Sequence, residues 1–516
     1  MVLFSRVAVL LLASSLIHAE VKVLTSNYGI ERTNASLQET VLTPASVNPD
    51  RFGKLGSFAV DGDMYAQPLY VPGVVIGGVA RNVVFAVTMH NSVYAIDADV
   101  PASNTPLWKV NLGAAVPSEV NDSEDTEPET GILSTPVIDV ERNTVYVVAA
   151  TMVKDAMGYY LHALDLSTGA EKPGSPAEIK AVMDGGGDTS EGGKITFDPL
   201  MHLQRPGLLL ANDNIYIAFG SHADTWPYHG WIFAYSAANV QQQVAVFNTT
   251  PQGDYGAVWQ SGRGLAADAD GNIYVASGNG DYDGVQNFGE SLLKLSPALK
   301  LLDWYTPPNW EYLSDFDFDM GSLGPMFVPG TDLILSGDKF GNIYLADKKN
   351  LGHLDTMPAP SPRVLLASLY GGVFNTAIWK SESGTVFYIV DQGDALKAFK
   401  IVDGQLPTAP FSTTDVTADI PYQGMTVTAN GSTAGTGILW MTTGDHDTDG
   451  VPGTLHAFDA LDLKKELWNS NTKQERDQLG AFAKFVSPTV ANGRVYVPTF
   501  SKQLVIYGLL PQTPAQ

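Results

Sequence analysis

The chain has 516 residues, of which 44% are hydrophobic and only 16% charged, and its formal net charge at pH 7 is −25. A chain this apolar buries a large core, which excludes intrinsic disorder, and its acidic surface repels phosphate backbones and anionic lipid, which argues against nucleic acid and membrane partners. The chain has no cysteine, which excludes disulfides, thiolate metal sites and thiol catalysis.

Residues 1–19 have the pattern of a secretory signal peptide. Arg6 precedes the apolar run VAVLLLASSLI, which is too short to span a bilayer, and cleavage is expected after Ala19. The mature chain is therefore expected to be secreted or to stay in the lumen of the secretory pathway, without membrane insertion. Four Asn-x-Ser/Thr triplets suit this route and are predicted glycosylation sites: Asn34, Asn121, Asn248 and Asn430.

One unit of sequence is repeated along the rest of the chain. Its copy at residues 91–108 joins an alternating run, SVYAID, to a turn-rich connection and then to a Leu-Trp pair that opens another strand. Variants recur at residues 159–171, 230–247, 289–304, 341–354, 394–406 and 453–468, and KQLVIYGLL is the last copy. Four short strands in a period of about 50 to 60 residues are typical of a β-propeller and not of a solenoid.

In chain order, the repeat divides into units of four strands. Residues 20–62 form a lead-in that ends in a strand over residues 53–60, and the first full unit follows as AQPLYV, NVVFAVT, SVYAID and LWKVNL. Later units are predicted to begin at Gly131, His202 and Val258, and near Gly321, Phe374 and Gly424. The eighth unit supplies only three strands, FVSPTVA, RVYVPTF and QLVIYGLL.

The missing fourth strand of the eighth unit is what the orphan strand of the lead-in can supply. Pairing the two ends of the chain closes a ring and removes the open sheet edges of a linear array. The predicted fold is therefore all-β, an eight-bladed β-propeller of four-stranded blades whose last blade is completed by an N-terminal strand. We expect one domain over residues 20–516, with the blades at residues 63–510. We also expect a monomer, because a closed ring needs no partner.

Propeller geometry predicts where a site would lie. Loops that lead into the innermost strands and loops that join the second and third strands open on one face, so their polar residues converge over the central channel. The predicted catalytic residues are the hydrogen-bond and proton donors among them: Arg263, Arg205, His202 and Lys484. The predicted substrate-binding residues are Trp259, Gln260, Trp226, Tyr228, His229, Tyr65, Gln67 and Asn375. Aromatic rings interleaved with imidazoles suit a flat, apolar ligand that carries a few oxygens.

No metal site is predicted. The acidic loops GDYDG and GDHDTDG remain alternatives for calcium, because clustered oxygens are the ligands that calcium prefers, but no Asp/Glu/Asn set can be assigned. The chain also contains no His-Glu-x-x-His pair and no Gly-x-Ser-x-Gly elbow, so zinc protease and serine hydrolase activities have no support.

The repeat carries a family resemblance. The pattern Ala-x-Asp, a turn and then Trp, as in AIDAD…LW and AFDAL…LW, resembles the repeat of pyrroloquinoline-quinone-type propellers over almost the whole mature chain. The resemblance implies a quinoprotein-like fold. Members that oxidise alcohols or sugars hold the quinone with calcium or a lanthanide, and many alcohol dehydrogenases among them add a disulfide of neighbouring cysteines, which this chain lacks.

A narrower resemblance concerns the opening of the mature chain. The segments NYGIERTNASLQETVLTPASVN, FGKLGSFAVDGDMYAQPLYV and TMHNSVYAIDAD are similar to secreted fungal quinoprotein-like propellers. Some fungal proteins of this kind are similar to the hetero-Diels-Alderases of tropolone-sesquiterpenoid biosynthesis. That resemblance implies an activity class and identifies no catalytic residue.

Three functions are weighed. The first is a cofactor-free hetero-Diels-Alder cycloaddition that joins a tropolone quinone methide to a humulene-type sesquiterpene, where positioning alone contributes roughly 7 to 11 kcal/mol and Arg, Lys or His donors stabilise the developing charge. The second is an alcohol or sugar dehydrogenase with pyrroloquinoline quinone and calcium, in which Trp259 or Trp226 stacks on the quinone, Arg263 polarises its carbonyl and an Asp takes the proton. The third is a non-catalytic ligand-binding propeller. The expected partners are small apolar or aromatic substrates, and the first function, without cofactor, is placed ahead of the second.

Overall fold

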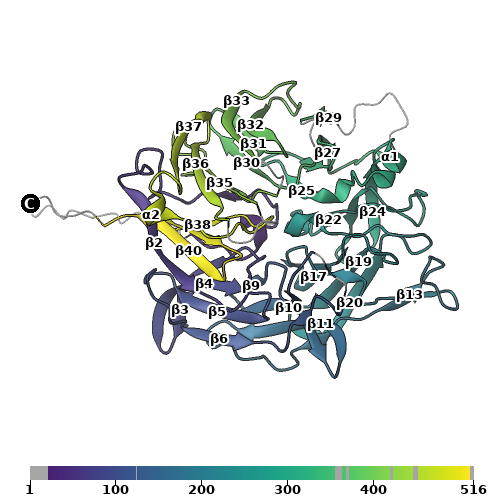
Figure 1. Ribbon diagram of the computed structural model, residues 1–516. Coiled ribbons are helices and arrows are strands. Elements are labelled where there is room, and N and C mark those ends of the chain that lie inside the picture. The colour runs from purple at the N-terminus through teal and green to yellow at the C-terminus, as the bar shows by residue number, and fades with distance from the viewer. Residues whose placement is uncertain are drawn as a thin grey trace, which may run out of the picture.

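The computed structural model describes residues 21–121, 123, 125–354, 363–367, 371–418, 422–445 and 451–511. Within these residues eight sheets, antiparallel apart from one short added strand in each of two blades, are arranged around a central channel, which confirms the predicted all-β, eight-bladed propeller (Figure 1). The α-helices are short, α1 (Trp310–Asp315) and α2 (Gln474–Asp477). In the part of the chain described, no helix is long and apolar enough to cross a bilayer. The predicted signal peptide lies outside the described residues.

The first four blades are built from strands close to those predicted. Blade 1 consists of β3 (Leu69–Ile76), β4 (Val79–Val87), β5 (Ser92–Asp97) and β6 (Trp108–Asn111). Blade 2 consists of β9 (Val137–Asp139), β10 (Thr144–Val153), β11 (Ala156–Asp165) and β12 (Ala177–Glu178). Blade 3 consists of β16 (Leu209–Ala211), β17 (Asn214–Ala218), β19 (Trp231–Ser236) and β20 (Asn239–Asn248). Blade 4 consists of β21 (Ala266–Ala267), β22 (Ile273–Ala276), β23 (Leu292–Leu295), β24 (Leu301–Thr306) and the added parallel strand β28 (His353–Leu354).

The other four blades complete the ring. Blade 5 consists of β25 (Leu323–Phe327), β26 (Leu333–Gly337), β27 (Asn342–Asp347) and β29 (Arg363–Leu366). Blade 6 consists of β30 (Thr376–Ser381), β31 (Gly384–Ile389), β32 (Asp394–Ile401) and β33 (Ser412–Ala418). Blade 7 consists of β34 (Met425–Thr428), β35 (Ile438–Thr443), β36 (Thr454–Asp459) and β37 (Asp462–Asn469), with β1 (Ala35–Ser36) added in parallel. Blade 8 consists of β38 (Thr489–Ala491), β39 (Arg494–Pro498), β40 (Gln503–Leu509) and β2 (Phe52–Ala59).

Shorter elements lie between and beside the blades. Three ribbons pair β7 (Val116–Pro117) with β8 (Glu129–Thr130), β13 (Val182–Asp184) with β14 (Lys194–Thr196), and β15 (His202–Leu203) with β18 (Gly220–Ser221). The 3₁₀ turns are η1 (Ser26–Tyr28), η2 (Gln260–Gly262) and η3 (Met320–Ser322). The turns η2 and η3 lead into the inner strands of blades 4 and 5 and therefore help to position the channel residues described below.

Burial follows the position of a strand within its blade. Every residue of β5 is buried, because neighbouring blades cover both faces of a middle strand. The outer strand β6 alternates between half-buried and exposed residues, and most of β37 is exposed or half-buried. This difference explains why the middle strands read as nearly continuous apolar runs, whereas the outer strands carry polar residues.

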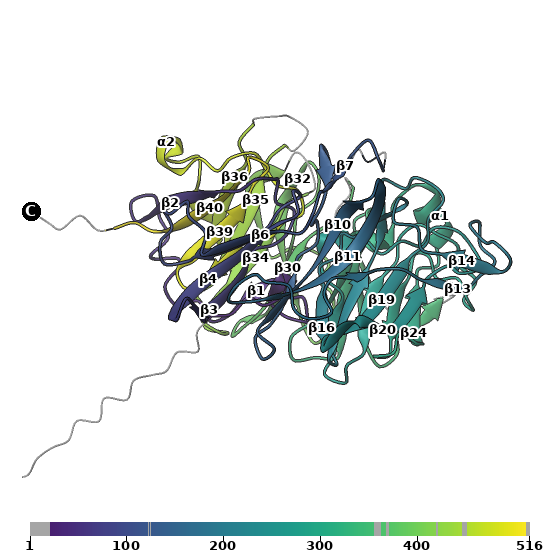
Figure 2. The same ribbon diagram turned by 90° about the horizontal axis from the view of Figure 1, so that it is seen from below.

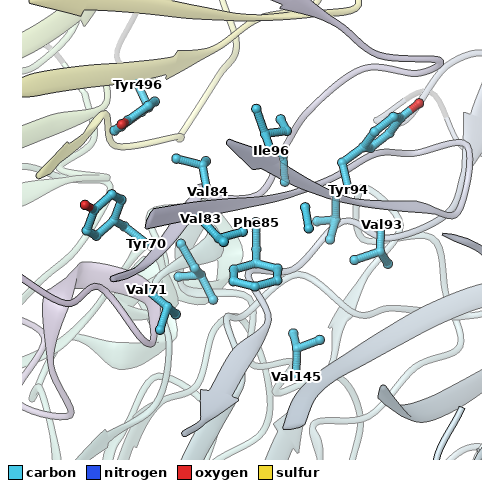
Figure 3. Packing of buried hydrophobic residues seen from close by; sticks show 14 of the residues in the cluster. Tyr70, Val71, Val83, Val84, Phe85, Val93, Tyr94, Ile96, Val145 and Tyr496 are labelled. Atoms are coloured by element: carbon cyan, nitrogen blue, oxygen red, sulfur yellow. The ribbon is translucent and has the colours of Figure 1, made fainter. Parts of the chain in front are cut away.

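Apolar side chains from adjacent blades interlock. Figure 3 shows this core at blade 1, where Phe85 lies in one cluster with Val145 of blade 2. On the other side of the blade, the ring of Tyr70 stacks against that of Tyr496 of blade 8, with centroids 6.4 Å apart. Every blade thus depends on both of its neighbours, which is the source of the ring's stability.

Closure of the ring is confirmed in the predicted form. Strand β2 pairs antiparallel with β40, in a register from Phe52 opposite Leu509 to Ala59 opposite Gln503. The purple β2 and the yellow β40 lie side by side in Figure 1. The ring of Phe52 is fully buried at this junction and contacts Trp468, with centroids 4.9 Å apart.

The lead-in also forms a second, inner ring, which the sequence did not predict. Between Val23 and Ser36 the chain passes the inner strand of each blade and hydrogen-bonds to the blades in ring order. The blade residues that it contacts, from blade 1 to blade 8, are Tyr70, Ile138, Leu208, Ala267, Phe327, Ile378, Val427 and Val490. Figure 2 shows its strand β1 beside β34 of blade 7. The lead-in thereby gives partners to backbone groups on the inner edges of the sheets.

The four predicted glycosylation sites differ in exposure. Asn34, Asn121 and Asn248 are buried, and the Asn34 amide donates to Asn375 Oδ1 and to the Thr376 carbonyl inside the channel. Asn430 is exposed in the turn that follows β34. A glycan on any of the three buried amides would displace packed protein, so glycosylation of the folded chain stays a prediction for Asn430.

Candidate active site

A pocket of about 350 Å³ opens at one end of the central channel. Its walls come from two sets of loops, those that lead into inner strands and those that join second and third strands, as propeller geometry predicts. Residues from the first set are Asp125, Arg205, Trp259, Asp317, Asp319, Phe374, Tyr422, Lys484 and Phe485. Residues from the second set are Ser221, Ala223, Asp224, Tyr228, Gly278, Asn279 and Lys339.

Three of these side chains form a connected unit. The indole N–H of Trp259 donates to Asp319 Oδ2 over 2.7 Å, and Lys339 Nζ lies 2.7 Å from Asp319 Oδ1. Lys339 also lies 5.1 Å above the centroid of the Trp259 ring. The carboxylate of Asp319 is buried, with 2% of its side chain exposed, so both of its hydrogen-bond partners act on it in a poorly hydrated place. The unit combines a flat aromatic surface, a carboxylate and an ammonium group.

The protonation of this unit is perturbed. Burial raises the pKa of Asp319 above its ordinary value, and the Lys339 ammonium opposes that rise. A second buried acid, Glu290, accepts a hydrogen bond from the Met320 backbone N–H, and burial together with the Asp319 charge raises the pKa of Glu290 well above its usual range. Burial by itself lowers the pKa of Lys339, but the carboxylates of Asp319 and Asp317 outweigh it and raise that pKa. Lys339 is therefore a fixed cation, and Asp319 is a carboxylate that binds a proton more readily than an exposed one.

Aromatic rings also surround Trp259. The centroid of the Trp259 ring lies 5.9 Å from that of Phe374 and 6.0 Å from that of Phe485. The Tyr422 ring contacts both phenylalanines, at 5.4 Å and 4.8 Å. Such a wall of rings accommodates a flat, conjugated molecule better than a flexible polar one.

A second charged group lies across the pocket. Asp125 is 4.0 Å from both Arg205 Nη2 and Lys484 Nζ, and the Arg205 guanidinium stands 5.4 Å from the centroid of Phe485. Burial opposes ionisation of Asp125, but Arg205 and Lys484 lower its pKa below the ordinary value. Two cations against one anion leave a net positive charge at this wall, which suits an anionic group on the ligand.

Oxygen atoms suited to a cation are present but few. Asn279 donates to Asp317 Oδ1 over 3.0 Å, and its own Oδ1 is buried without a hydrogen-bond partner. In the described part of the chain, no group of three or more His, Cys, Asp or Glu side chains could hold a metal ion. Asp317, Asp319 and Asn279 come closest to forming a set of cation ligands. The Lys339 ammonium already pairs with both of these carboxylates.

Of the predicted site residues, four line this pocket: Arg205, Lys484, Trp259 and Tyr228. Four others border a small cavity that shares Phe374 and Phe485 with the pocket: Arg263, Tyr65, Gln67 and Asn375. His202 and His229 border a separate cavity near β14 and bond to one another through a ring nitrogen and backbone groups. Gln260 is fully buried and bonds to backbone groups of blade 4, whereas Trp226 is 56% exposed.

The pocket contains residues that the sequence did not single out as a site. Asp319 precedes η3 in the segment that leads into blade 5, and this blade was predicted to begin near Gly321, just after it. Lys339 lies in the loop between β26 and β27, a second-to-third strand loop of the kind expected to face the channel, but it was not among the predicted site residues. Phe374 and Phe485 each lie directly beside a residue that was chosen, Asn375 and Lys484. A start two residues earlier for blade 5 would have included Asp319, whereas the two phenylalanines already stood at the predicted starts of their units.

No protein-family model matches the sequence, and no curated protein matches it either. Solved structures do resemble the fold. A quinohemoprotein alcohol dehydrogenase from Pseudomonas putida is 14% identical with a TM-score of 0.61, and the match covers 96% of this chain and 82% of that one. The quinohemoprotein alcohol dehydrogenase of Comamonas testosteroni is 14% identical with a TM-score of 0.58, covering 97% and 83%. A europium-containing methanol dehydrogenase is 13% identical with a TM-score of 0.58, covering 95% and 98%. The chain therefore shares the propeller fold of quinoprotein dehydrogenases.

Proposed function

We propose that the protein is a quinone-dependent oxidoreductase that oxidises small alcohols in the channel pocket. The observation that carries this proposal is the unit formed by Trp259, Asp319 and Lys339, in which a flat ring, a buried carboxylate and a fixed cation meet. The fold shared with quinoprotein alcohol and methanol dehydrogenases supports it by analogy.

The residues present fit a planar quinone. Trp259 offers a partly buried indole face, and Phe374 and Phe485 close the space around it. Pyrroloquinoline quinone is a flat tricarboxylate, and the net positive wall formed by Arg205, Lys484 and Asp125 supplies charge for its carboxylates. These residues would hold the quinone between an aromatic surface and a cationic edge.

The fit for calcium is less complete. Calcium takes six to eight oxygen ligands, whereas Asp317, Asp319 and Asn279 can contribute about five at most, and only if both carboxylates bind bidentately. The unpartnered Oδ1 of Asn279 is the oxygen in this group that is free for a cation. The quinone and water must supply the remaining ligands, so we expect calcium to bind only together with the quinone.

A bound quinone would supply the acceptor for the hydride that leaves the alcohol carbon. Asp319 accepts the hydroxyl proton, and its raised pKa makes it a stronger base than an exposed carboxylate. The Trp259 N–H and the Lys339 ammonium hold the carboxylate in one orientation, which limits the reorganisation needed during proton transfer. Loss of a proton and a hydride converts the alcohol to an aldehyde or ketone.

Reconstitution of the purified protein tests this proposal. The protein is incubated with pyrroloquinoline quinone and calcium, and reduction of an electron-accepting dye is followed with a series of primary alcohols and sugars. We expect dye reduction that requires both the alcohol and the quinone and that a calcium chelator diminishes. Absence of alcohol-dependent reduction at saturating quinone would contradict the proposal.

Cofactor-free cycloaddition stays the second candidate, and one observation favours it. The wall of Trp259, Phe374, Phe485 and Tyr422 could hold two apolar partners face to face, with Lys484 or Arg205 donating to a developing oxyanion. Incubation with a tropolone precursor and a humulene-type terpene, without quinone, tests it. An unchanged rate and isomer ratio relative to buffer would eliminate this function.

A further inference from the structure

Two arginine side chains are buried in the channel without an acidic partner. Arg32 of the lead-in is fully buried, and 3% of Arg263 is exposed. Arg32 donates to the Leu265 and Leu208 carbonyls and to groups of Thr25 and Ser26. Arg263 donates to the carbonyls of Arg32 and Thr376 and to Asn375 Oδ1. All of these acceptors are neutral, and within the described residues neither guanidinium lies within 4.0 Å of a carboxylate oxygen. The charge of Glu31 acts on Arg32 only from beyond that distance.

This arrangement leaves most of the positive charge uncompensated, because Glu31 acts on Arg32 from a distance and no acid acts on Arg263. A guanidinium does not lose its proton under ordinary conditions, and a buried charge is costly unless an opposite charge meets it. Burial and the neighbouring Arg32 lower the pKa of Arg263 to about 9, which is the direction expected for a cation that lacks an anion. Carbonyl oxygens stabilise the two groups only in part, because they carry partial charges.

A small cavity adjoins Arg263 beneath the main pocket. Its volume is about 20 Å³, and Phe374 and Phe485 border both it and the pocket above. Two N–H donors of its lining residues, Arg263 Nε and Gln67 Nε2, are buried and have no hydrogen-bond partner. The orientation of the Gln67 amide is fixed, because its Oε1 accepts the backbone N–H of Asn27 over 2.8 Å. Its donor end is therefore the end left unpaired.

We propose that this cavity binds one small monovalent anion of the size of chloride, held by Arg263 Nε and Gln67 Nε2. The volume exceeds the roughly 10 to 15 Å³ that a water-sized particle needs, and it leaves no room for a carboxylate or phosphate group. The anion would offset part of the charge of Arg263 and Arg32 and would satisfy both orphaned donors. The lining residue Asn27 also has an unpaired buried acceptor, Oδ1, so water is the competing occupant. The assignment does not depend on the proposed oxidoreductase activity.

Crystals of the unaltered full chain soaked in sodium bromide give the deciding measurement. We expect an anomalous difference peak in the cavity, within hydrogen-bond distance of Arg263 Nε and Gln67 Nε2. A cavity that holds only water in saturating bromide would overturn the proposal. This measurement needs no variant, which matters because replacing Arg263 removes several channel hydrogen bonds and endangers folding.

A solution measurement uses a milder change. Unfolding by urea is compared in sodium chloride and in sodium gluconate at equal ionic strength, for the unaltered protein, Gln67→Leu and the control Gln204→Leu. Gln204 is also buried but does not line the cavity. For the unaltered protein and Gln204→Leu, we expect an unfolding constant about tenfold smaller in chloride than in gluconate, as for an anion present at about ten times its Kd. Gln67→Leu should lose most of this difference. An equal response of all three proteins would indicate a general salt effect and would overturn the site.

Discussion

Replacing Asp319 with asparagine separates the base from the rest of the pocket. Asparagine has nearly the same shape, and its oxygen can still accept the Trp259 N–H, but it cannot take a proton from a substrate hydroxyl. Its NH2 group takes the place of the oxygen that pairs with Lys339, so that one contact is lost. Lys339 keeps an ion pair with Asp317, whose Oδ1 lies 2.5 Å from Nζ, so the variant should fold. Asp319→Asn therefore tests proton transfer with little change in the architecture of the site.

The expected size of the effect follows from the role assigned to Asp319. Loss of a positioned general base costs roughly 100- to 10,000-fold in rate. This loss corresponds to about 3 to 5 kcal/mol of transition-state stabilisation. The KM for the alcohol should change much less, because the aromatic wall that binds the ligand stays in place. The assay is alcohol-dependent dye reduction by the protein reconstituted with quinone, with kcat and KM determined separately.

The pH profile gives an independent check. The base must be ionised to act, so kcat/KM should rise with pH through the pKa of Asp319, which burial places above the range of an exposed carboxyl group. Asp319→Asn should lack this rising limb. The control is Asp268→Asn, because Asp268 is a buried carboxylate in the blade 4 hairpin, outside the pocket, where it bonds to Asn272 and Tyr274. A rate for Asp319→Asn within threefold of the control, with the same pH profile, would refute the reasoning.

Three further predictions concern stability and modification. Phe52→Ala should lower the free energy of unfolding by about 3 to 5 kcal/mol in urea titrations, because Phe52 is fully buried against Trp468 where the ring closes; a loss below about 1 kcal/mol would contradict this role of the closing strand. Burial lowers the pKa values of His202 and His222 to about 4, so each histidine stays neutral in the folded protein while the unfolded chain binds a proton below about pH 6.5. The free energy of unfolding should therefore decrease as the pH falls from 6.5 toward 4, by up to about 3 kcal/mol for each histidine. Urea titrations at pH 7 and pH 4.5 should show His222→Asn to be less sensitive to acid than the unaltered protein, and equal sensitivity would count against the effect. Secretion from a eukaryotic host should place a glycan at Asn430, and mass spectrometry that finds Asn430 unmodified would disprove this.

The fold could be predicted from the sequence because each repeat unit shows the residue pattern of short β-strands separated by turns. Middle strands such as β5 are apolar at most positions, and turns rich in Gly, Asn and Asp separate them. Because the last unit has only three such strands, its fourth strand had to come from another part of the chain. The path of the lead-in between Val23 and Ser36 could not be read in this way. Its bonds to the blades are mainly made by backbone groups, which leave no residue pattern, and its strand β1 has only two residues.

The site was predictable in outline and less so in detail. Inner-strand approaches were expected to face the channel, and Arg205, Trp259 and Lys484 do line the pocket. Sequence position does not show how deep along the channel a side chain reaches, however. Arg263 follows Trp259 by only four residues, yet its guanidinium bonds to carbonyls of the lead-in and of blade 6 below the pocket. Asp319 could not be predicted as a site residue, because an isolated Asp in a turn has no distinguishing pattern in the sequence. Only the fold brings it next to Trp259 and Lys339.

Titration calorimetry with pyrroloquinoline quinone tests the central claim most directly. The unaltered protein and Trp259→Leu are titrated with the quinone in the presence and absence of calcium. We predict saturable binding to the unaltered protein, tighter with calcium. Binding to Trp259→Leu should be weakened by about 5- to 13-fold, as expected when an aromatic stacking surface worth about 1 to 1.5 kcal/mol is lost. Equal affinities of the two proteins for the quinone, or no binding by either, would contradict the assignment of this pocket to a quinone.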